Sequence, residues 1–241
     1  MRNIFLPAFL LAIISFSSCN YIGGKRVRGN GNVISQERNV GDFKGVRSHG
    51  FFDVFLSSGP TASVRIEAEE NIQPHIEAFL EGDVLKVESE DGYWLRPRRD
   101  VKIFITSPSL KEVKVYGSGN ITSQSKITNP EKMQMGIYGS GNIKADIDAP
   151  MVEADISGSG DIILSGQVKS FDGEINGSGD IKAMDLKTEE TKVSINGSGD
   201  AAVYASMNLN IDVRGSGDVR YKGPAHVTSD IRGSGSVKKI D

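Results

Sequence analysis

The second half of the chain carries a repeat in which the triplet Gly-Ser-Gly recurs seven times. The copies begin at Gly117, Gly139, Gly158, Gly177, Gly197, Gly215 and Gly233, so successive copies are 22, 19, 19, 20, 18 and 18 residues apart. A period near 20 residues is too short for the common helical repeats and fits one coil of a β-solenoid. We therefore predict an all-β fold, a parallel β-helix with about 18–22 residues per coil.

Apolar residues flank every triplet at fixed positions. Two residues before the triplets stand Val115, Ile137, Ile156, Ile175, Ile195, Val213 and Ile231. Two residues after them stand Ile121, Ile143, Ile162, Ile181, Ala201, Val219 and Val237. Because side chains alternate between the two faces of a strand, both columns are predicted to point inward and to stack from coil to coil. Glycine at the triplets allows a sharp corner and a close approach of neighbouring backbones. An antiparallel meander of hairpins is the alternative, and the near-constant spacing favours the coil.

Residues 29–112 lack the triplet and are predicted to form irregular coils at the start of the same domain. Strands are expected at Phe51–Leu56, Ser63–Glu69, Val84–Glu88 and Val101–Thr106, where β-branched and apolar residues run between turn residues. A short helical turn is expected within Glu69–Leu80, because Ile72, Ile76 and Phe79 recur at helical spacing.

The N-terminus resembles a bacterial lipoprotein signal. Arg2 precedes an apolar run from Ile4 to Phe16, which ends at Ser17-Ser18-Cys19, the only cysteine of the chain. The resemblance implies a signal peptide at residues 1–18, a lipidated and palmitate-bearing Cys19, a tether at residues 19–28 and a folded domain at residues 29–241. An ordinary secretory signal with an incidental cysteine is the alternative. A lipid on Cys19 would hold the protein in the cell envelope.

Composition argues against nucleic-acid binding and gives little support to catalysis. The net charge of −3 and a pI near 5.7 provide no basic field that would attract nucleic acid. His49, His75 and His226 lie in unrelated contexts without the spacing of metal ligands. No serine stands in a nucleophile-elbow motif. We therefore predict a non-enzyme without a cofactor.

An acidic column follows four consecutive triplets and has two interpretations. Asp161, Asp180, Asp200 and Asp218 occupy the same place in their repeats. Carboxylates from adjacent coils could bind a cation such as calcium, which takes six or more oxygen ligands. Aspartate and asparagine also bond nearby backbone groups at tight turns. Asn120 and Asn142 fill the same column, which favours turn chemistry.

Two groups of residues are candidates for ligand contact. Tyr116 and Tyr138 directly precede their triplets and are predicted to form an outward pair that could stack a sugar ring. Trp94 and Arg96 lie in a segment rich in arginine that could contact a partner. Ordinary cross-strand pairing explains the tyrosines equally well, and Trp94 could instead cap the core.

The repeats resemble a known family. Two of the repeat motifs are Gly117-Ser118-Gly119-Asn120-Ile121 and Gly158-Ser159-Gly160-Asp161-Ile162, and they are preceded by Gly29-Asn30-Gly31-Asn32-Val33 and Gly50-Phe51-Phe52-Asp53-Val54. Together these motifs resemble the DUF2807 family, which is described as an auto-transporter adhesin head domain and is common in Bacteroidota envelope proteins. The resemblance implies a right-handed β-helix and no established activity. Asn20 to Lys25 contain no acidic residue of the kind that accompanies surface export in Bacteroidota, so both faces of the outer membrane remain open.

We predict a non-catalytic, adhesin-like envelope lipoprotein that binds a glycan or an envelope protein. A carbohydrate-processing β-helix enzyme is one alternative. A structural protein whose coils stack end to end is the other.

Overall fold

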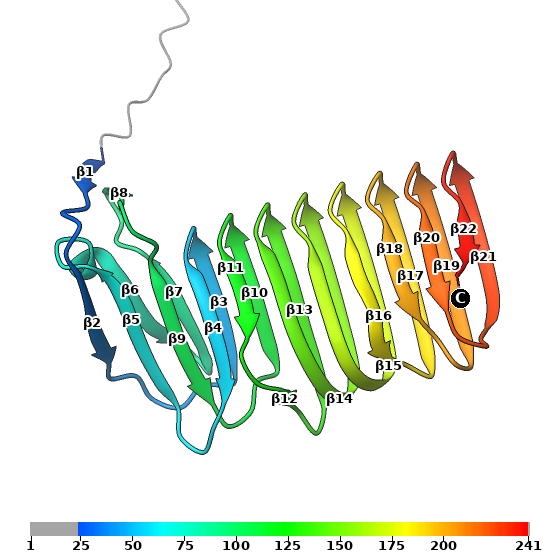
Figure 1. Cartoon of the computed structure of the whole chain (residues 1–241), viewed down its shortest axis with the longest axis horizontal. Helices are drawn as coiled ribbons and strands as arrows, with labels where there is room; N and C mark the ends of the chain where they lie inside the picture. Colours follow the sequence, from blue (N-terminus) through cyan, green and yellow to red (C-terminus); the bar gives the residue numbers. More distant parts are fainter. Residues whose placement is uncertain (1–23, 241) are drawn as a thin grey trace, which may run out of the picture.

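The Gly-Ser-Gly triplets form equivalent corners along one edge of a wound β-ribbon (Figure 1). The structure is a computed structural model that describes residues 24–240. Gly117 pairs in register with Gly139, which pairs with Gly158, and the parallel register continues to Gly233. The chain is an all-β solenoid of about six turns with about 20 residues per turn, as the repeat predicts. The right-handed sense of winding stays a prediction.

Each coil has one strand that enters its corner and one that leaves it. The entering strands are β3 (Gly45–Gly50), β10 (Glu112–Gly117), β13 (Lys132–Gly139), β14 (Asn142–Gly158), β15 (Ile162–Gly177), β17 (Glu190–Gly197), β19 (Asn208–Gly215) and β21 (His226–Gly233). The leaving strands are β4 (Asp53–Ser58), β11 (Asn120–Ser123), β16 (Ile181–Lys187), β18 (Ala201–Tyr204), β20 (Val219–Lys222) and β22 (Val237–Lys239). Strands β14 and β15 are long enough to serve both roles in one stretch.

The difference in repeat length is taken up on the side opposite the corners. In the longest repeat, a short strand β12 (Ile127–Thr128) and its flanking loops separate β11 from β13. In one of the shortest, only residues 205–207 separate β18 from β19. The corners therefore keep a constant register while the opposite connections vary.

The two apolar columns line the core. Their first six members are each at most 1% exposed, from Val115 and Ile121 in the first repeat to Val213 and Val219 in the sixth. The seventh members differ, because Ile231 is 37% exposed and Val237 is only half-buried. These two residues keep the register of the columns, but the predicted burial is not reached there, because within residues 24–240 no further coil lies against them.

Glycine at the corners is required by close stacking as well as by backbone conformation. Gly158 has a φ of 142°, where other residues are strained. Gly160 lacks a positive φ, but a Cβ there would lie 2.9 Å from the Gly141 carbonyl carbon and closer still to its oxygen. The first corner is Gly50-Phe51-Phe52, in register with Gly117-Ser118-Gly119. Phe52 replaces the second glycine and is fully buried, so its side chain belongs to the core at this corner.

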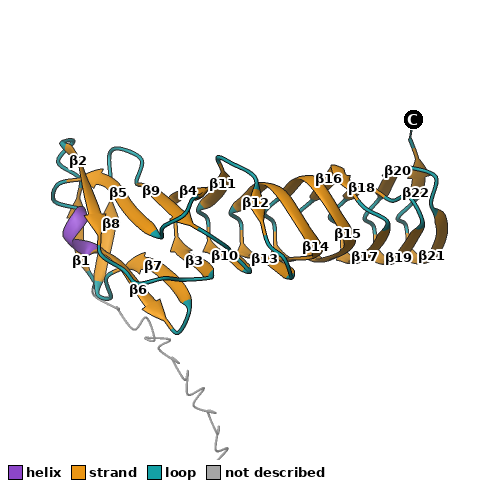
Figure 2. Cartoon of the chain, turned by 90° about the horizontal axis from the view of Figure 1, so that it is seen from below, coloured by secondary structure: helices purple, strands orange, loops and turns teal. Residues whose placement is uncertain are grey.

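The N-terminal region closes this end with antiparallel strands (Figure 2). Strand β5 (Ser63–Glu69) lies between β2 (Val33–Arg38) and β9 (Lys102–Ser107), antiparallel to both. Strands β6 (Ile76–Glu81) and β7 (Val84–Ser89) form a hairpin, whose β7 joins the solenoid beside β3. The expected helical turn is limited to the 3₁₀ helix η1 (Gln73–His75), because Ile76 and Phe79 belong to β6.

A separate two-stranded parallel sheet pairs β1 (Lys25–Arg28) with β8 (Tyr93–Arg96). The last four residues of the predicted tether form the strand β1. The predicted signal peptide and Cys19 lie outside the described residues. Within residues 24–240, no helix has the length and apolar character needed to cross a membrane.

Candidate functional site

Three stacked rings form a row on the outer face of the first coils, here called the aromatic ladder: His49, Tyr116 and Tyr138. Their residues are in register on β3, β10 and β13, each directly before the first glycine of a corner. The ring centroids of His49 and Tyr116 are 4.4 Å apart, and those of Tyr116 and Tyr138 are 4.8 Å apart. The predicted pairing of the tyrosines is observed. His49 was not expected in the row, although its place before Gly50 is the signal that identifies it.

The aromatic ladder ends at Tyr138, and the next coil leaves one face of that ring uncovered. The residue in register with Tyr138 is Ser157, whose short side chain is exposed. Tyr138 is 37% exposed. Its ring lies over Gly136, where a Cβ would be 3.1 Å from the ring carbon Cε2. Partial burial raises the pKa of the Tyr138 hydroxyl, which is therefore a neutral hydrogen-bonding group at neutral pH.

Carboxylates stand on the strands beside the open end of the aromatic ladder. Asp155 is in register with Gly136 on one side and with Glu174 on the other. Burial, together with the charges of Glu174, Glu153 and Asp172, raises the pKa of Asp155. Glu153 accepts a hydrogen bond from the Gln134 Nε2 at 3.1 Å. This surface thus offers several oxygen acceptors beside an aromatic face.

Glu112 lies on the other side of the same surface and forms ion pairs with two basic side chains. It pairs with the Arg47 Nε at 2.6 Å and the Lys114 Nζ at 2.8 Å. Burial acts to raise the pKa of Glu112, but the hydrogen bonds from Arg47 and Lys114 outweigh it and hold the pKa below its usual value. Glu112 is therefore a structural anion of this face.

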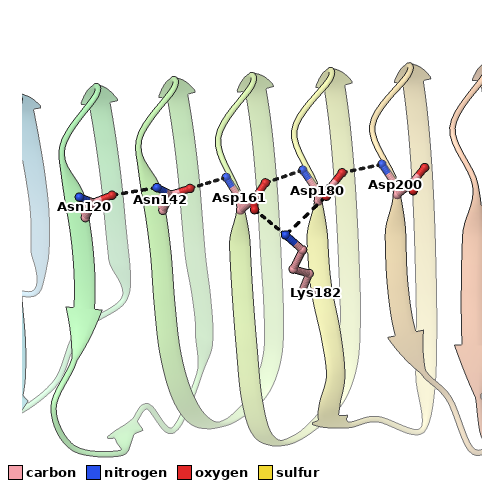
Figure 3. A network of polar contacts seen from close by, with 6 residues as sticks. All are labelled: Asn120, Asn142, Asp161, Asp180, Lys182 and Asp200. Atoms are coloured by element: carbon pink, nitrogen blue, oxygen red, sulfur yellow. Dashed lines mark hydrogen bonds and ion pairs between the residues drawn. The ribbon is translucent and has the colours of Figure 1, made fainter.

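The acidic column forms a ladder of side-chain to backbone hydrogen bonds (Figure 3). The Asp161 Oδ1 accepts from the backbone N–H of Asp180 at 3.2 Å, and the Asp180 Oδ1 accepts from that of Asp200 at 3.0 Å. Asp218 continues the pattern toward Ser236. Lys182 bridges Asp161 and Asp180 at 2.5 and 3.5 Å. These contacts are those of turn chemistry.

No group of three or more His, Cys, Asp or Glu side chains within residues 24–240 has an arrangement suited to a metal ion.

In the column before the triplets, Arg214 and Arg232 pair with Asp212 and Asp230 on their own strands at 2.9 and 2.8 Å. The distal part of the column therefore carries neutralised charges, in contrast to the aromatic ladder.

The other predicted ligand residues, Trp94 and Arg96, lie together on β8. The structure places them on the two-stranded sheet, so they form a location separate from the aromatic ladder. Trp94 is 55% exposed, which contradicts its alternative role as a cap of the core. Arg26 and Arg28 of β1 lie beside them, and sequence reasoning missed both because it assigned them to a tether.

Comparisons with known proteins agree with this architecture. The family model described as "Putative auto-transporter adhesin, head GIN domain", DUF2807, matches residues 42–225. The fold is similar to a crystal structure named a putative adhesin from Bacteroides fragilis NCTC 9343, with a TM-score of 0.82 at 22% identity, covering 89% of this chain and 100% of that one.

Two structures from Parabacteroides distasonis ATCC 8503 are also similar. One is named a putative adhesin, with a TM-score of 0.74 at 27% identity, and the other a putative lipid binding protein, with a TM-score of 0.70 at 29% identity. Each comparison covers 90% of this chain and 100% of the other. No curated protein matches the chain. The names of the family and of these structures include no catalytic activity.

Proposed function

The chain belongs to the DUF2807 family, and we propose that it is a non-catalytic, adhesin-like module of the cell envelope that binds glycans on the aromatic ladder. The family supports a binding role, because its description and its solved relatives refer to adhesins. The geometry around Tyr138 supports a glycan as the ligand.

The open face of Tyr138 is the observation that carries this proposal. The rings of the aromatic ladder repeat at 4.4 and 4.8 Å, close to the spacing of neighbouring strands. Above Ser157 the row lacks a ring, so a sugar ring fits there as the next member and covers the exposed face of Tyr138. Stacking on an amphipathic ring and hydrogen bonds to carboxylates suit the apolar faces and hydroxyl groups of a sugar. Asp155 and Glu174 stand in the coils where those hydroxyl groups would lie.

A glycan array probed with the full chain and with Tyr138→Ala tests the proposal. Removing the stacking ring is expected to weaken binding to the best glycan about tenfold, which corresponds to about 1.4 kcal/mol. Tyr204→Ala is the matched control, since Tyr204 lies on β18 beside Lys187 and away from the aromatic ladder. Equal binding by Tyr138→Ala and the unmodified chain to every glycan would exclude this site.

The proposal includes an anchor at Cys19. A lipid there would hold the module in the envelope, and two or more acyl chains are needed for stable attachment. Mass spectrometry of the protein from membranes is expected to show acyl chains that are lost in Cys19→Ala. An unmodified cysteine in the mature protein would instead support the secretory-signal alternative.

The two alternative functions, a carbohydrate-processing enzyme and a self-stacking structural protein, can be tested with the same purified protein. The raised pKa of Asp155 beside Glu174 is the feature that supports an enzyme, because catalytic carboxylates are tuned in this way. Release of a cleaved sugar product would favour that function. The exposure of Ile231 in the last described coil supports end-to-end stacking, and filaments that form with rising concentration would favour it.

A further inference from the structure

Four arginines line a hollow at the N-terminal end of the described chain. Its walls are Arg26, Arg28, Arg96, Pro97 and Arg98, and its volume is about 420 Å³. We call it the arginine hollow. It belongs to the sheet of β1 and β8, so it is a different surface from the aromatic ladder and its role is independent of glycan binding.

The parallel register explains why these side chains converge. Arg26 is paired with Trp94, and Arg28 with Arg96. Because side chains alternate along a strand, these four residues share one face, and all four are exposed. Val27 and Leu95 point the other way and pack against the core. Trp94 lies across Gly24, where any Cβ would overlap its indole ring.

The arginines of the hollow are not neutralised by the part of the chain that the structure describes. Within residues 24–240, no side-chain ion pair or hydrogen bond is formed by Arg26, Arg28, Arg96 or Arg98. The contrast with Arg214 and Arg232, which both pair with aspartates, shows that exposed arginines elsewhere on this protein find partners.

The Glu69 carboxylate contacts Arg98 of the hollow, but only through the backbone. It is fully buried, and its two oxygens accept the backbone N–H groups of Gly31 at 2.5 Å and Arg98 at 2.7 Å. Converging guanidinium groups repel one another, and an anion that entered the hollow would relieve that repulsion. The hollow therefore has the charge and the space of an anion site.

We propose that the arginine hollow binds the phosphate group of an anionic lipid headgroup. Guanidinium groups match phosphate with paired N–H donors, and several of them can hold one phosphate from different sides. Exposed tryptophan beside arginine is characteristic of surfaces that lie at a membrane interface. The described residues begin beside the hollow, at Gly24, so a lipid at Cys19, five residues earlier in the sequence, would bring the hollow close to the bilayer surface. That last point depends on the proposed lipid at Cys19, whereas headgroup binding does not.

Trp94 makes the test direct, because it is the only tryptophan of the chain. The full chain in nonionic detergent is titrated with micelles that contain phosphatidylglycerol, while the emission of Trp94 is recorded. Phosphatidylcholine micelles, inorganic phosphate and glycerol phosphate are titrated in parallel. We expect a saturable emission change with phosphatidylglycerol and an affinity that falls as salt increases.

The variant Arg28→Gln/Arg96→Gln removes two charges from the hollow without touching Trp94 or the core. Its affinity for phosphatidylglycerol is expected to fall about 25-fold, because each of the two basic residues contributes about fivefold at a membrane surface. Lys238→Gln/Lys239→Gln is the matched control, because it removes the same charge from β22 at the far end of the solenoid and is expected to change affinity less than about twofold. Circular dichroism confirms that both variants fold.

Three results would overturn the proposal. Equal responses to phosphatidylglycerol and phosphatidylcholine would show that phosphate charge is not recognised. Equal losses in the two variants would assign binding to net charge alone. Equal affinity for inorganic phosphate and for the lipid would make the hollow a site for free phosphate.

Discussion

Replacing Gly160 by alanine tests whether close stacking at the corners stabilises the solenoid. Gly160 lies in the middle of the stack and has no positive φ, so the substitution adds a methyl group without straining the backbone conformation. That Cβ would lie 2.9 Å from the Gly141 carbonyl carbon and 3.0 Å from the Ile137 Cγ2, compared with 3.4 Å or more in ordinary contacts. The two corners must separate by at least about half an ångström, and by more at the carbonyl oxygen.

Separation of the corners weakens three hydrogen bonds between the coils. Ser159 donates its backbone N–H to the Gly139 oxygen at 2.9 Å, Asp161 to the Asn142 Oδ1 at 3.0 Å, and Ile143 to the Asp161 oxygen at 2.9 Å. Each bond contributes about 1 kcal/mol, so Gly160→Ala is expected to lower the free energy of unfolding by about 3 kcal/mol.

Urea unfolding followed by circular dichroism measures this loss. Gly82→Ala is the control, because Gly82 has a φ of 65° and no atom lies within 4 Å of the methyl group that alanine would add there, so only the backbone strain of about 1 kcal/mol applies. Unchanged m-values would show that both variants unfold as the parent does. If Gly160→Ala lost no more stability than Gly82→Ala, close stacking would not be the reason for the second glycine.

Four further outcomes follow from burial and charge. Ile175→Ala is expected to lower the unfolding free energy in urea by about 3 kcal/mol, because Ile175 is fully buried, whereas Ile163→Ala, at a position 36% exposed, should cost under about 0.5 kcal/mol. Asp180→Ala removes the acceptor for the next coil and is expected to cost about 1 kcal/mol in the same assay, with no rise in melting temperature when calcium is added to the parent. The pKa of Asp155 is raised in the folded protein, so the contribution of Asp155 to stability declines as pH rises from the usual aspartate pKa through the raised one. Asp155→Asn should therefore melt at a higher temperature than the parent at neutral pH and lose that advantage in acid. The pH dependence of stability has the opposite sign at Glu112, because the pKa of Glu112 is lowered in the folded protein. The stabilisation by Glu112 is present above the usual glutamate pKa and is lost as pH falls through the folded value. Glu112→Gln should therefore melt at a lower temperature than the parent at neutral pH and at the same temperature in acid.

The repeated half of the fold was predictable because the same corner motif occurs seven times in its sequence. Each corner needs a glycine where the chain turns and a second where the preceding coil approaches, and each flank needs an apolar side chain. A single Gly-Ser-Gly would carry little information. Near-constant spacing with constant flanks identifies a coil, because hairpins would not require identical residues on both sides of every turn.

The N-terminal region was harder to predict because its sequence contains no repeated motif from which the pairing of its strands could be inferred. Alternating apolar residues in β5 and β9 identify strands but not their partners, and both belong to antiparallel pairs that a parallel coil does not suggest. Phe52 departs from the glycine rule because no preceding corner lies against it. Its large side chain is fully buried in the core instead.

The candidate sites were predictable to different degrees. Tyr116 and Tyr138 follow from the repeat register, which also includes His49 once Gly50 is recognised as a corner. The arginine hollow does not follow from the sequence, because the pairing of Arg28 with Arg96 joins segments that are distant along the chain. Its charge is visible in the composition of each segment, but its shape depends on a two-stranded sheet without a repeat.

The contrast between a constant edge and a variable one has a consequence for how such a protein can change over evolutionary time. Insertions opposite the corners, where repeats already differ between 18 and 22 residues, leave the glycine contacts untouched. Insertions at a corner would break those contacts with both adjacent turns. Duplication of one complete unit lengthens the molecule by about 4.8 Å and creates no new type of contact. Selection can therefore adjust length and loop content independently of the scaffold.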